Sequence, residues 1–214
     1  RAPLVVGGPD ATAMHKASGG SHQKKRKVFV PWKAGKKHGR GKSTYADGNS
    51  YEGEYAEGKM HGKGTFTWAN DDVYEGYWHQ GVQHGRGVKR LANGEIYDGE
   101  WSQGKVSGKG CKIFSSGDVH FGFYSDDRRN GYGEYKWSNL DIYVGGWVDG
   151  KMEGLGVKRM QGGDKYQGEW KADCARGRGI KTFAVGDRHH GMYVRDKREG
   201  WGAYEWSNGD SYEG

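Results

Sequence analysis

The stretch GKKHGRGKST, residues 35–44, has the residue types of a phosphate-binding loop, because glycines flank basic side chains and a Gly-Lys-Ser triplet lies within it. A nucleotide-binding loop of this kind requires Gly-x-x-x-x-Gly-Lys-Ser, so that successive backbone amides surround the phosphates. Here the residue five positions before Gly41 is Lys36, and Gly35 lies one position too far away. The spacing therefore argues against a nucleotide site.

The histidines and cysteines are the next candidates, because their side chains could bind a metal ion or form a disulfide. His38, His61 and His84 recur every 23 residues, but if each repeat adds two strands they lie roughly 10 Å apart, whereas zinc binds imidazole at about 2 Å. Cys111 and Cys174 are nearly three repeats apart, too far for a disulfide. We expect no metal site, no cofactor and no catalytic constellation, so the segment is predicted not to be an enzyme.

Composition favours short strands and tight turns. The 214 residues include 41 Gly and 3 Pro, 14% are aromatic, and the mean hydropathy is −1.03. Disordered chains lack aromatic residues, whereas glycine with tyrosine and tryptophan is typical of all-β proteins with many turns. No apolar stretch is long enough for a membrane span or a signal peptide, so we expect a soluble chain. Because it begins with arginine and ends within a repeat, we expect a fragment of a longer protein.

An internal repeat of 23 residues explains the glycines. A Tyr-x-Gly or His-x-Gly motif begins at residues 51, 74, 97, 120, 143, 166, 189 and 212, and Gly-x-Gly pairs recur at the same interval from Gly39. We number the first residue of each such motif as position 0. Position +4 is then always aromatic, and position +17 is always large and apolar.

Each repeat is predicted to be one β-hairpin. Side chains alternate along a strand, so positions 0, +2 and +4 share a face that is aromatic, glycine, aromatic, and each glycine leaves room for a ring. The predicted fold is an all-β, elongated single-sheet solenoid of stacked antiparallel hairpins over residues 28–214. We expect its rings to line an aromatic groove that docks proteins: Trp32, Tyr51, Tyr55, Trp68, Tyr74, Trp78, Tyr97, Trp101, Tyr124, Trp137, Tyr143, Trp147, Tyr166, Trp170, Tyr193 and Trp206.

The segments YEGEYAEGKMHGKGTFTW and YDGEWSQGKVSGKG resemble MORN repeats, whose pattern is Tyr-x-Gly-x-Trp, a glycine turn and Gly-x-Gly. The resemblance implies a non-enzymatic scaffold in a cytoskeletal, ciliary or membrane-junction setting. The segment GRGVKRLANGEIYDGEW is also similar to the MORN region of plant-type phosphatidylinositol phosphate 5-kinases. The alternative function is therefore the regulatory region of such a kinase, whose catalytic domain this chain lacks.

Two departures from the pattern recur. His120 and His189 replace the tyrosine at position 0, and Asp127, Asp173 and Asp196 replace the glycine at +7. These repeats are predicted to pack more loosely. Whole blocks also return after 69 residues, as GVKRLANGEIYDGEW and GVKRMQGGDKYQGEW do.

Positive charge is concentrated at the N-terminal end. Residues 1–42 contain 11 Lys and Arg against a single acid, whereas residues 43–214 contain 23 against 26 acids. We expect a disordered basic arm at residues 1–27 and an anionic-surface site formed by Lys24, Lys25, Arg26, Lys27, Lys36, Lys37, Arg40, Lys63, Arg86 and Lys109. Arg40, Lys63, Arg86 and Lys109 occupy position +12 in the first four repeats. The later repeats have Tyr132, Leu155, Arg178 and Trp201 there, so the position becomes more apolar along the array.

The expected partners are proteins, with acidic phospholipids as a further prediction and no nucleic acid. Homo-oligomers could form through the open sheet edges. The chain is predicted to be cytoplasmic and peripheral to a membrane or the cytoskeleton. The run from Lys24 to Lys27 makes a nuclear location the alternative.

If the basic residues bind lipid, the protein should sediment with liposomes that contain anionic lipid, and less so as salt increases. Charge reversal at Arg40, Lys63, Arg86 and Lys109 should then reduce the bound fraction. Unchanged sedimentation of this variant would contradict the prediction.

Overall fold

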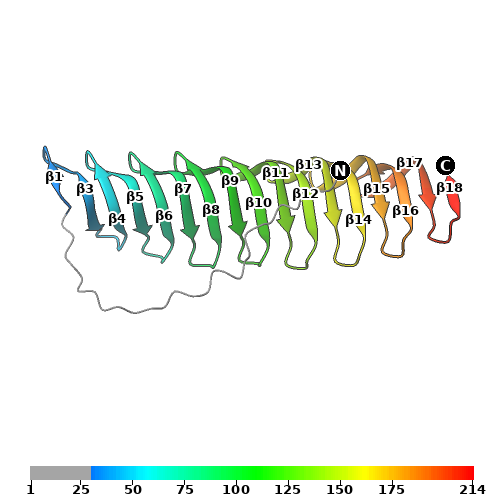
Figure 1. Cartoon of the computed structure of the whole chain (residues 1–214), viewed down its shortest axis with the longest axis horizontal. Helices are drawn as coiled ribbons and strands as arrows, with labels where there is room; N and C mark the ends of the chain where they lie inside the picture. The colour runs from blue at the N-terminus through cyan, green and yellow to red at the C-terminus, as the bar shows by residue number, and fades with distance from the viewer. Residues whose placement is uncertain (1–29) are drawn as a thin grey trace, which may run out of the picture.

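The computed structural model describes residues 30–214, which form an elongated stack of β-hairpins (Figure 1). This range contains no helix, and therefore none that could cross a membrane. The predicted basic arm, including Lys24 to Lys27, lies outside the described residues. The strands are β1 (Trp32–Lys33), β2 (Lys36–Lys37), β3 (Gly39–Thr44), β4 (Ser50–Ala56), β5 (Lys59–Thr67), β6 (Val73–His79), β7 (Val82–Arg90), β8 (Ile96–Ser102), β9 (Lys105–Ile113), β10 (Val119–Ser125), β11 (Arg128–Lys136), β12 (Ile142–Val148), β13 (Lys151–Arg159), β14 (Lys165–Lys171), β15 (Cys174–Thr182), β16 (Arg188–Val194), β17 (Lys197–Glu205) and β18 (Ser211–Glu213).

Strands β3 to β18 form one open antiparallel sheet in which every strand pairs with its neighbours in sequence. The small β1–β2 hairpin precedes it, and Pro31 accepts a hydrogen bond from the amide of His38 at the β3 end of the array. The predicted all-β solenoid of hairpins is therefore confirmed.

Each full repeat contains a seven-residue and a nine-residue strand joined by a two-residue turn, as in β4 and β5. Both residues of that turn are left-handed, with φ of 51° at Glu57 and 85° at Gly58. This is the backbone of a type I′ turn, whose twist matches that of the flanking strands. Each hairpin thus has a two-residue turn at the same position of the 23-residue repeat.

The aspartates that replace glycine at +7 bind the preceding hairpin. Asp127, Asp173 and Asp196 adopt φ of 67° to 70°, which aspartate tolerates better than most residues. Their carboxylates accept hydrogen bonds of 2.7 to 2.8 Å from the amides of residues 106, 152 and 175. The predicted looser packing of these turns is wrong, because each aspartate adds a bond between repeats that glycine cannot make.

The other turn also ties successive repeats together. Asp72, for example, accepts a hydrogen bond of 2.8 Å from the amide of Ala92 in the next repeat. Equivalent bonds of 2.8 to 3.0 Å, donated by backbone amides of the next repeat, are accepted by Asn49, Asp118, Asp141, Asp164 and Asp187. These side chains hold adjacent turns in register on one edge of the stack.

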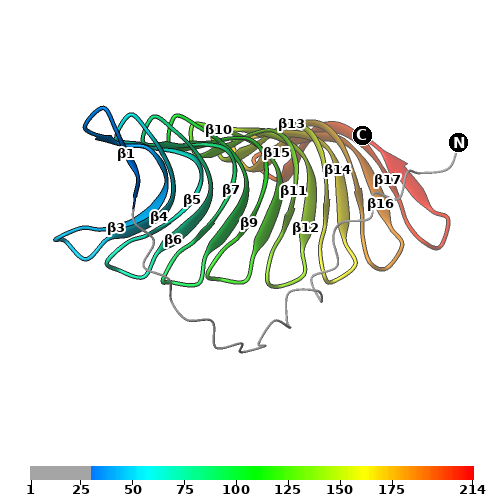
Figure 2. The same ribbon diagram turned by 60° about the vertical axis from the view of Figure 1, so that its left-hand side comes forward.

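Paired glycines make room for the rings. Gly76 lies opposite Gly87 across β6 and β7, and the register of the two strands shifts between Gly76 and Trp78. A side chain added at Gly76 would lie 2.6 Å from the hydroxyl of Tyr74, so only glycine fits beneath that ring. Register shifts of this kind bend the strand, and the strands accordingly follow a curved path (Figure 2).

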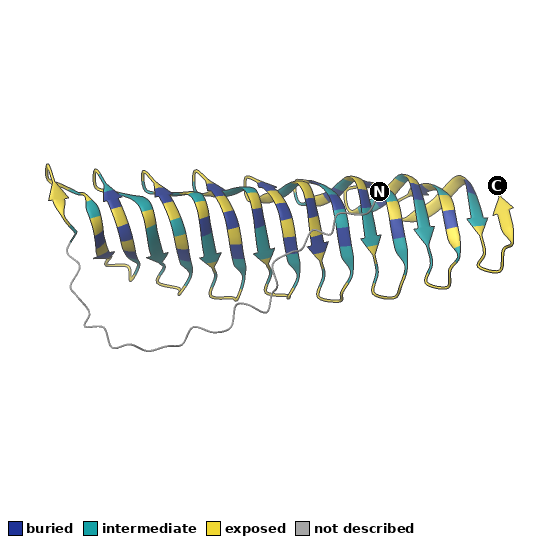
Figure 3. Cartoon of the chain, viewed as in Figure 1, coloured by how far each residue is buried: buried dark blue, intermediate teal, exposed yellow. Residues whose placement is uncertain are grey.

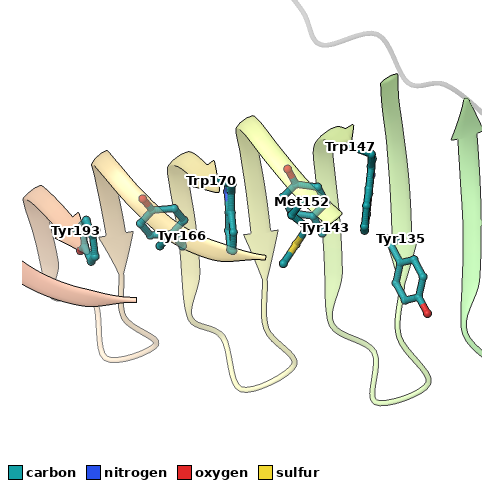
Figure 4. Close-up of a cluster of buried hydrophobic side chains, with 8 residues drawn as sticks. Tyr135, Tyr143, Trp147, Met152, Tyr166, Trp170 and Tyr193 are labelled. Carbon is teal, nitrogen blue, oxygen red and sulfur yellow. The ribbon is translucent and has the colours of Figure 1, made fainter. Parts of the chain in front are cut away.

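The two faces of the bent sheet have different roles. We call the face with positions 0, +2 and +4 the inner face, and the opposite one the outer face. Buried residues alternate with exposed ones along seven-residue strands such as β4, β8 and β10 (Figure 3). The buried rings form two clusters, one from Tyr51 to Tyr124 and one from Tyr135 to Tyr193 (Figure 4).

Substitution of Gly87 by alanine should locally destabilise the array, because the new methyl group would overlap the ring of Tyr74. Overpacking of this kind costs about 1–3 kcal/mol, and amide exchange in β6 and β7 should become faster by a corresponding factor. Gly162 is the matched control, because it has no positive φ and nothing lies within 4 Å of an added methyl group. Equal protection in Gly87→Ala and Gly162→Ala proteins would refute the ring-over-glycine account.

Candidate interaction surfaces

Most rings of the predicted aromatic groove form the core of the protein itself. Tyr51, Tyr74 and Tyr143 have no exposed area, and of the sixteen rings only Trp32 and Trp206 are clearly exposed, at 67% and 42%. Trp68 and Trp137 are half-buried. The structure brings the rings together in a row, but they face one another, so protein docking by them stays a prediction.

The rings pack edge to face along the array. The ring centroids of Tyr74 and Trp78 are 5.1 Å apart with an interplanar angle of 88°, and Tyr74 meets Trp101 of the next repeat at 5.1 Å and 81°. This is the favoured geometry for aromatic pairs. Each ring at position 0 from Tyr51 to Tyr166 thus contacts a ring of the next hairpin.

Most polar atoms of the buried rings are bonded to backbone, whereas the hydroxyls of Tyr55, Tyr124 and Tyr193 are bonded to side chains. The hydroxyl of Tyr74 donates to the carbonyl of Tyr77 at 3.0 Å, and the indole of Trp78 donates to the carbonyl of Gly64 at 3.1 Å. Burial raises the pKa of Tyr55 and of Tyr193 to about 12, so both phenols stay neutral. The row of rings therefore has the properties of a hydrophobic core, with its polar atoms hydrogen-bonded within the protein.

The row changes composition at His120, whose imidazole is fully buried. Its Nδ1 lies 2.7 Å from the hydroxyl of Tyr124, whereas its Nε2 has no hydrogen-bond partner. Arg129 stacks between Tyr135 and Trp147, with its guanidinium carbon 4.8 and 4.2 Å from the ring centroids. Burial, with a smaller contribution from Arg129, lowers the pKa of His120 to about 3.

The same arrangement returns 69 residues later. Nδ1 of His189 lies 2.6 Å from the hydroxyl of Tyr193, and Tyr204 donates to Asp187 at 2.8 Å, as Tyr135 does to Asp118 at 2.7 Å. The 69-residue period therefore corresponds to a set of hydrogen-bonded polar side chains that occurs twice in the core. Its histidines bind tyrosine and are placed to stabilise the stack.

The basic residues of the predicted anionic-surface site are divided between faces. Arg40, Lys63, Arg86 and Lys109 are exposed on the outer face, and Lys36 is exposed in β2. Lys37 instead donates to Ser43 at 2.7 Å and lies 5.3 Å above the ring of Tyr55. The structure therefore brings four of the ten residues into one line.

Carboxylates flank that line. Glu54 lies opposite Arg40 and Glu100 lies opposite Arg86 on neighbouring strands. A groove of 640 Å³ along this half of the outer face contains three of the four basic residues and four carboxylates: Arg40, Lys63, Arg86, Glu52, Glu54, Glu75 and Asp98. Charge on this half is therefore mixed rather than purely cationic.

His79 joins two of the recurring histidines. Its ring centroid lies 5.3 Å from that of His61 and 5.7 Å from that of His84. Sequence reasoning missed this contact, because His79 belongs to the other strand of the hairpin. Within residues 30–214, however, no group of three His, Cys, Asp or Glu residues is arranged to hold a metal ion.

The other half of the outer face has more exposed apolar side chains, although Glu169 lies opposite Leu155 and Arg178 lies opposite Met192. We define the outer apolar strip as six side chains with exposed fractions of 40% to 73%: Phe121, Phe123, Tyr132, Leu155, Met192 and Trp201. Grooves of 430 and 540 Å³ adjoin Leu155, and the backbone of Gly156, Gly168 and Gly179 lies along the first. The sequence indicated only part of this surface, through Tyr132, Leu155 and Trp201 at position +12.

Acidification should destabilise the array through His120. Because its pKa is about 3 when folded and near 6.5 when unfolded, only the unfolded state binds a proton between these values. Stability is therefore complete above pH 6.5 and decreases as pH falls, by about 2 kcal/mol at pH 5. Denaturation midpoints at pH 7 and pH 5 measure this loss, and His189, whose pKa burial also lowers, adds to it.

The matched variant is His120→Tyr, which recreates the Tyr51–Tyr55 pair that the first cluster already contains at 5.1 Å. It should lose less stability on acidification than the wild-type protein does. The half-buried His61 supplies the control His61→Tyr. An unchanged pH dependence in His120→Tyr would contradict the assignment.

A search of curated protein sequences finds no match to the chain. Among solved structures, the TCP domain of SAS-4 (dCPAP) from Drosophila melanogaster, in complex with a proline-rich motif of Ana2, is similar over 81% of this chain and 88% of that one, with 10% identity and a TM-score of 0.47. The TCP10 domain of Danio rerio CPAP is similar over 80% and 81%, with 13% identity and a TM-score of 0.47.

The family model described as MORN repeat matches eight consecutive segments, residues 32–50, 51–73, 74–96, 97–119, 120–142, 143–165, 166–188 and 189–211. Its boundaries at Tyr51, Tyr74 and Tyr97 coincide with the 23-residue frame, and each segment from residue 51 onward has the two strands of one hairpin. The chain therefore belongs to the MORN-repeat family.

Proposed function

We propose that this chain is a non-catalytic scaffold that docks a partner protein on the outer apolar strip. The observation that carries the proposal is the exposure of large side chains on a continuous sheet face, with 64% of Tyr132, 73% of Leu155 and 62% of Trp201 accessible. Contiguous apolar patches on a protein surface typically mark interaction sites.

The chemistry of the strip fits a protein interface. Tyrosine, tryptophan, methionine and arginine are enriched in such contacts, and Tyr132, Trp201, Met192 and Arg178 lie on this face, with Arg178 opposite Met192. The bare backbone of Gly156 and Gly168 lets a partner approach the sheet closely. A partner segment with apolar side chains would thus find anchors and grooves together.

The charged half of the outer face would set orientation. Arg40 and Arg86 alternate with Glu54 and Glu100 across neighbouring strands, and fixed patterns of charge favour one register of a bound protein over others. A partner that extends beyond the outer apolar strip would therefore meet a surface that selects its direction.

Phospholipid binding by Arg40, Lys63, Arg86 and Lys109 is our second proposal, supported by their exposure in one line. The neighbouring carboxylates oppose it, so we rank it below protein docking. A regulatory role in a phosphatidylinositol phosphate 5-kinase, a cytoplasmic or nuclear location, and oligomers formed through sheet edges also stay predictions.

Paired variants at position +12 test the docking proposal. Partners are first identified by cross-linking in cell extract, and each is then purified and titrated against the protein. Tyr132→Ser combined with Leu155→Ser should weaken binding at least 30-fold, because the loss of a single central anchor already costs about 2 kcal/mol or more.

The control is Lys63→Ser with Arg86→Ser, which changes the same position in earlier repeats of the sheet. Its effect should be smaller than fivefold. A partner that binds both double variants equally well, or that depends on the control pair alone, would place docking elsewhere.

A further inference from the structure

A cavity of 320 Å³ opens on the inner face above the ring row. Tyr97, Trp101 and Tyr124 form part of its lining, together with Leu91 and Val106. These five side chains are apolar or neutral. The cavity is therefore a hollow on the aromatic face whose floor is formed by the edges of buried rings.

A smaller side chain at Val106 leaves part of this space. Position +9 is Met60 in the first full repeat and Met152 in the fifth, and both pack with the core clusters. At the cavity the same position is Gln83 and then Val106, and both residues line it. The array is thus less filled here than where methionine covers the rings.

The cavity also contains a cation without a carboxylate partner. Position +15 is lysine in four repeats, and three of these lysines have a carboxylate within 4 Å: Lys112 with Glu95 at 2.9 Å, Lys158 with Asp141 at 3.5 Å and Lys181 with Asp164 at 3.0 Å. Within residues 30–214, Lys89 forms no such pair. Its ammonium group lies 4.9 Å above the ring of Trp68.

The acidic groups of the cavity are already engaged. Glu95 pairs with Lys112, and Asp127, which lies on the other turn of the hairpins, accepts the amide of Val106 at 2.8 Å. Lys89 is the charge that a bound group could neutralise. The site therefore combines an aromatic floor with one available ammonium group.

We propose that this cavity holds a large apolar side chain of an extended partner peptide, and that Lys89 pairs with a carboxylate adjacent to it. A volume of 320 Å³ is at the lower end of ligand cavities, which range over roughly 300–1,000 Å³, and suits one aromatic side chain. The sheet is open and its strands are curved (Figure 2). Residues of its inner face line the cavity, so a peptide can enter and leave it without closure of a lid. The proposal goes beyond docking on the outer apolar strip and does not depend on it.

Fluorescence anisotropy with two labelled peptides tests the proposal. Both have a phenylalanine flanked by glycines, followed by glutamate in one and by glutamine in the other. The glutamate peptide should bind about tenfold more tightly, as one partly desolvated ion pair predicts. Lys89→Met, which keeps the alkyl stem, should abolish this difference.

Two further variants separate the site from general effects. Lys158→Met is the matched control, because Lys158 occupies the equivalent position 69 residues later, lies 4.6 Å above Trp137 and is paired with Asp141. It should leave both affinities unchanged. Gln83→Met with Val106→Met fills the cavity with the residue found at the same position in other repeats, and it should weaken both peptides at least fivefold.

Absence of saturable binding up to millimolar peptide would overturn the proposal. So would retention of the glutamate preference in Lys89→Met, or its equal loss in Lys158→Met. Tighter binding of free 3-phenylpropanoate than of the glutamate peptide would instead identify a small-molecule site and overturn the peptide occupant. Because these variants leave the outer face unaltered, their outcome is independent of the docking test above.

Discussion

The whole array depends on an aromatic ring lying directly on a pair of glycines. In a single-layer sheet no second sheet or helix covers either face, so the core has to come from side chains that the sheet itself can enclose. Tyr74 achieves this over Gly76 and Gly87 with no exposed area, and its edge meets Trp78 and Trp101. Each hairpin therefore shares its core with the next, which is why stability in such arrays is a sum of neighbouring interfaces.

Departures from the motif are compensated by new contacts within the same frame. The histidine at position 0 is too short to reach the backbone carbonyl that tyrosine bonds, and His120 binds Tyr124 instead. That exchange leaves its Nε2 without a partner, which makes the repeat dependent on a neutral imidazole. At the turns, Asp127 gains a bond to the preceding hairpin that glycine lacks. Substitutions along the array therefore alter local properties while the period is retained.

The two faces allow function to be separated from folding. Residues of the inner face build the stack, and the cavity at Val106 is a local hollow over rings that are themselves buried. The outer face does not contribute to this core, so its side chains are free to vary from charged in the early repeats to apolar around Leu155. A repeat array can in this way present different surfaces along one rigid sheet.

Much of the fold followed from local pattern. Side-chain alternation and the 23-residue period place Tyr97 and Trp101 on one face and assign one hairpin to each repeat, because both properties depend only on positions within the same repeat. The same spacing showed that GKKHGRGKST belongs to β2 and β3 rather than to a phosphate loop. It also indicated that the surface becomes more apolar along position +12.

Only the tertiary structure decided which surfaces remain exposed. The register shift near Gly76 and the curvature of the sheet bury the rings that periodicity placed on an open groove. Cross-strand register brings Arg178 opposite Met192 and His79 beside His61, pairs whose members belong to different strands. Within residues 30–214 Lys89 has no carboxylate within 4 Å, whereas Lys112, Lys158 and Lys181 do, and this difference likewise depends on where neighbouring turns direct their acids. Sequence spacing determines the repeat, whereas exposure and charge balance depend on contacts between repeats.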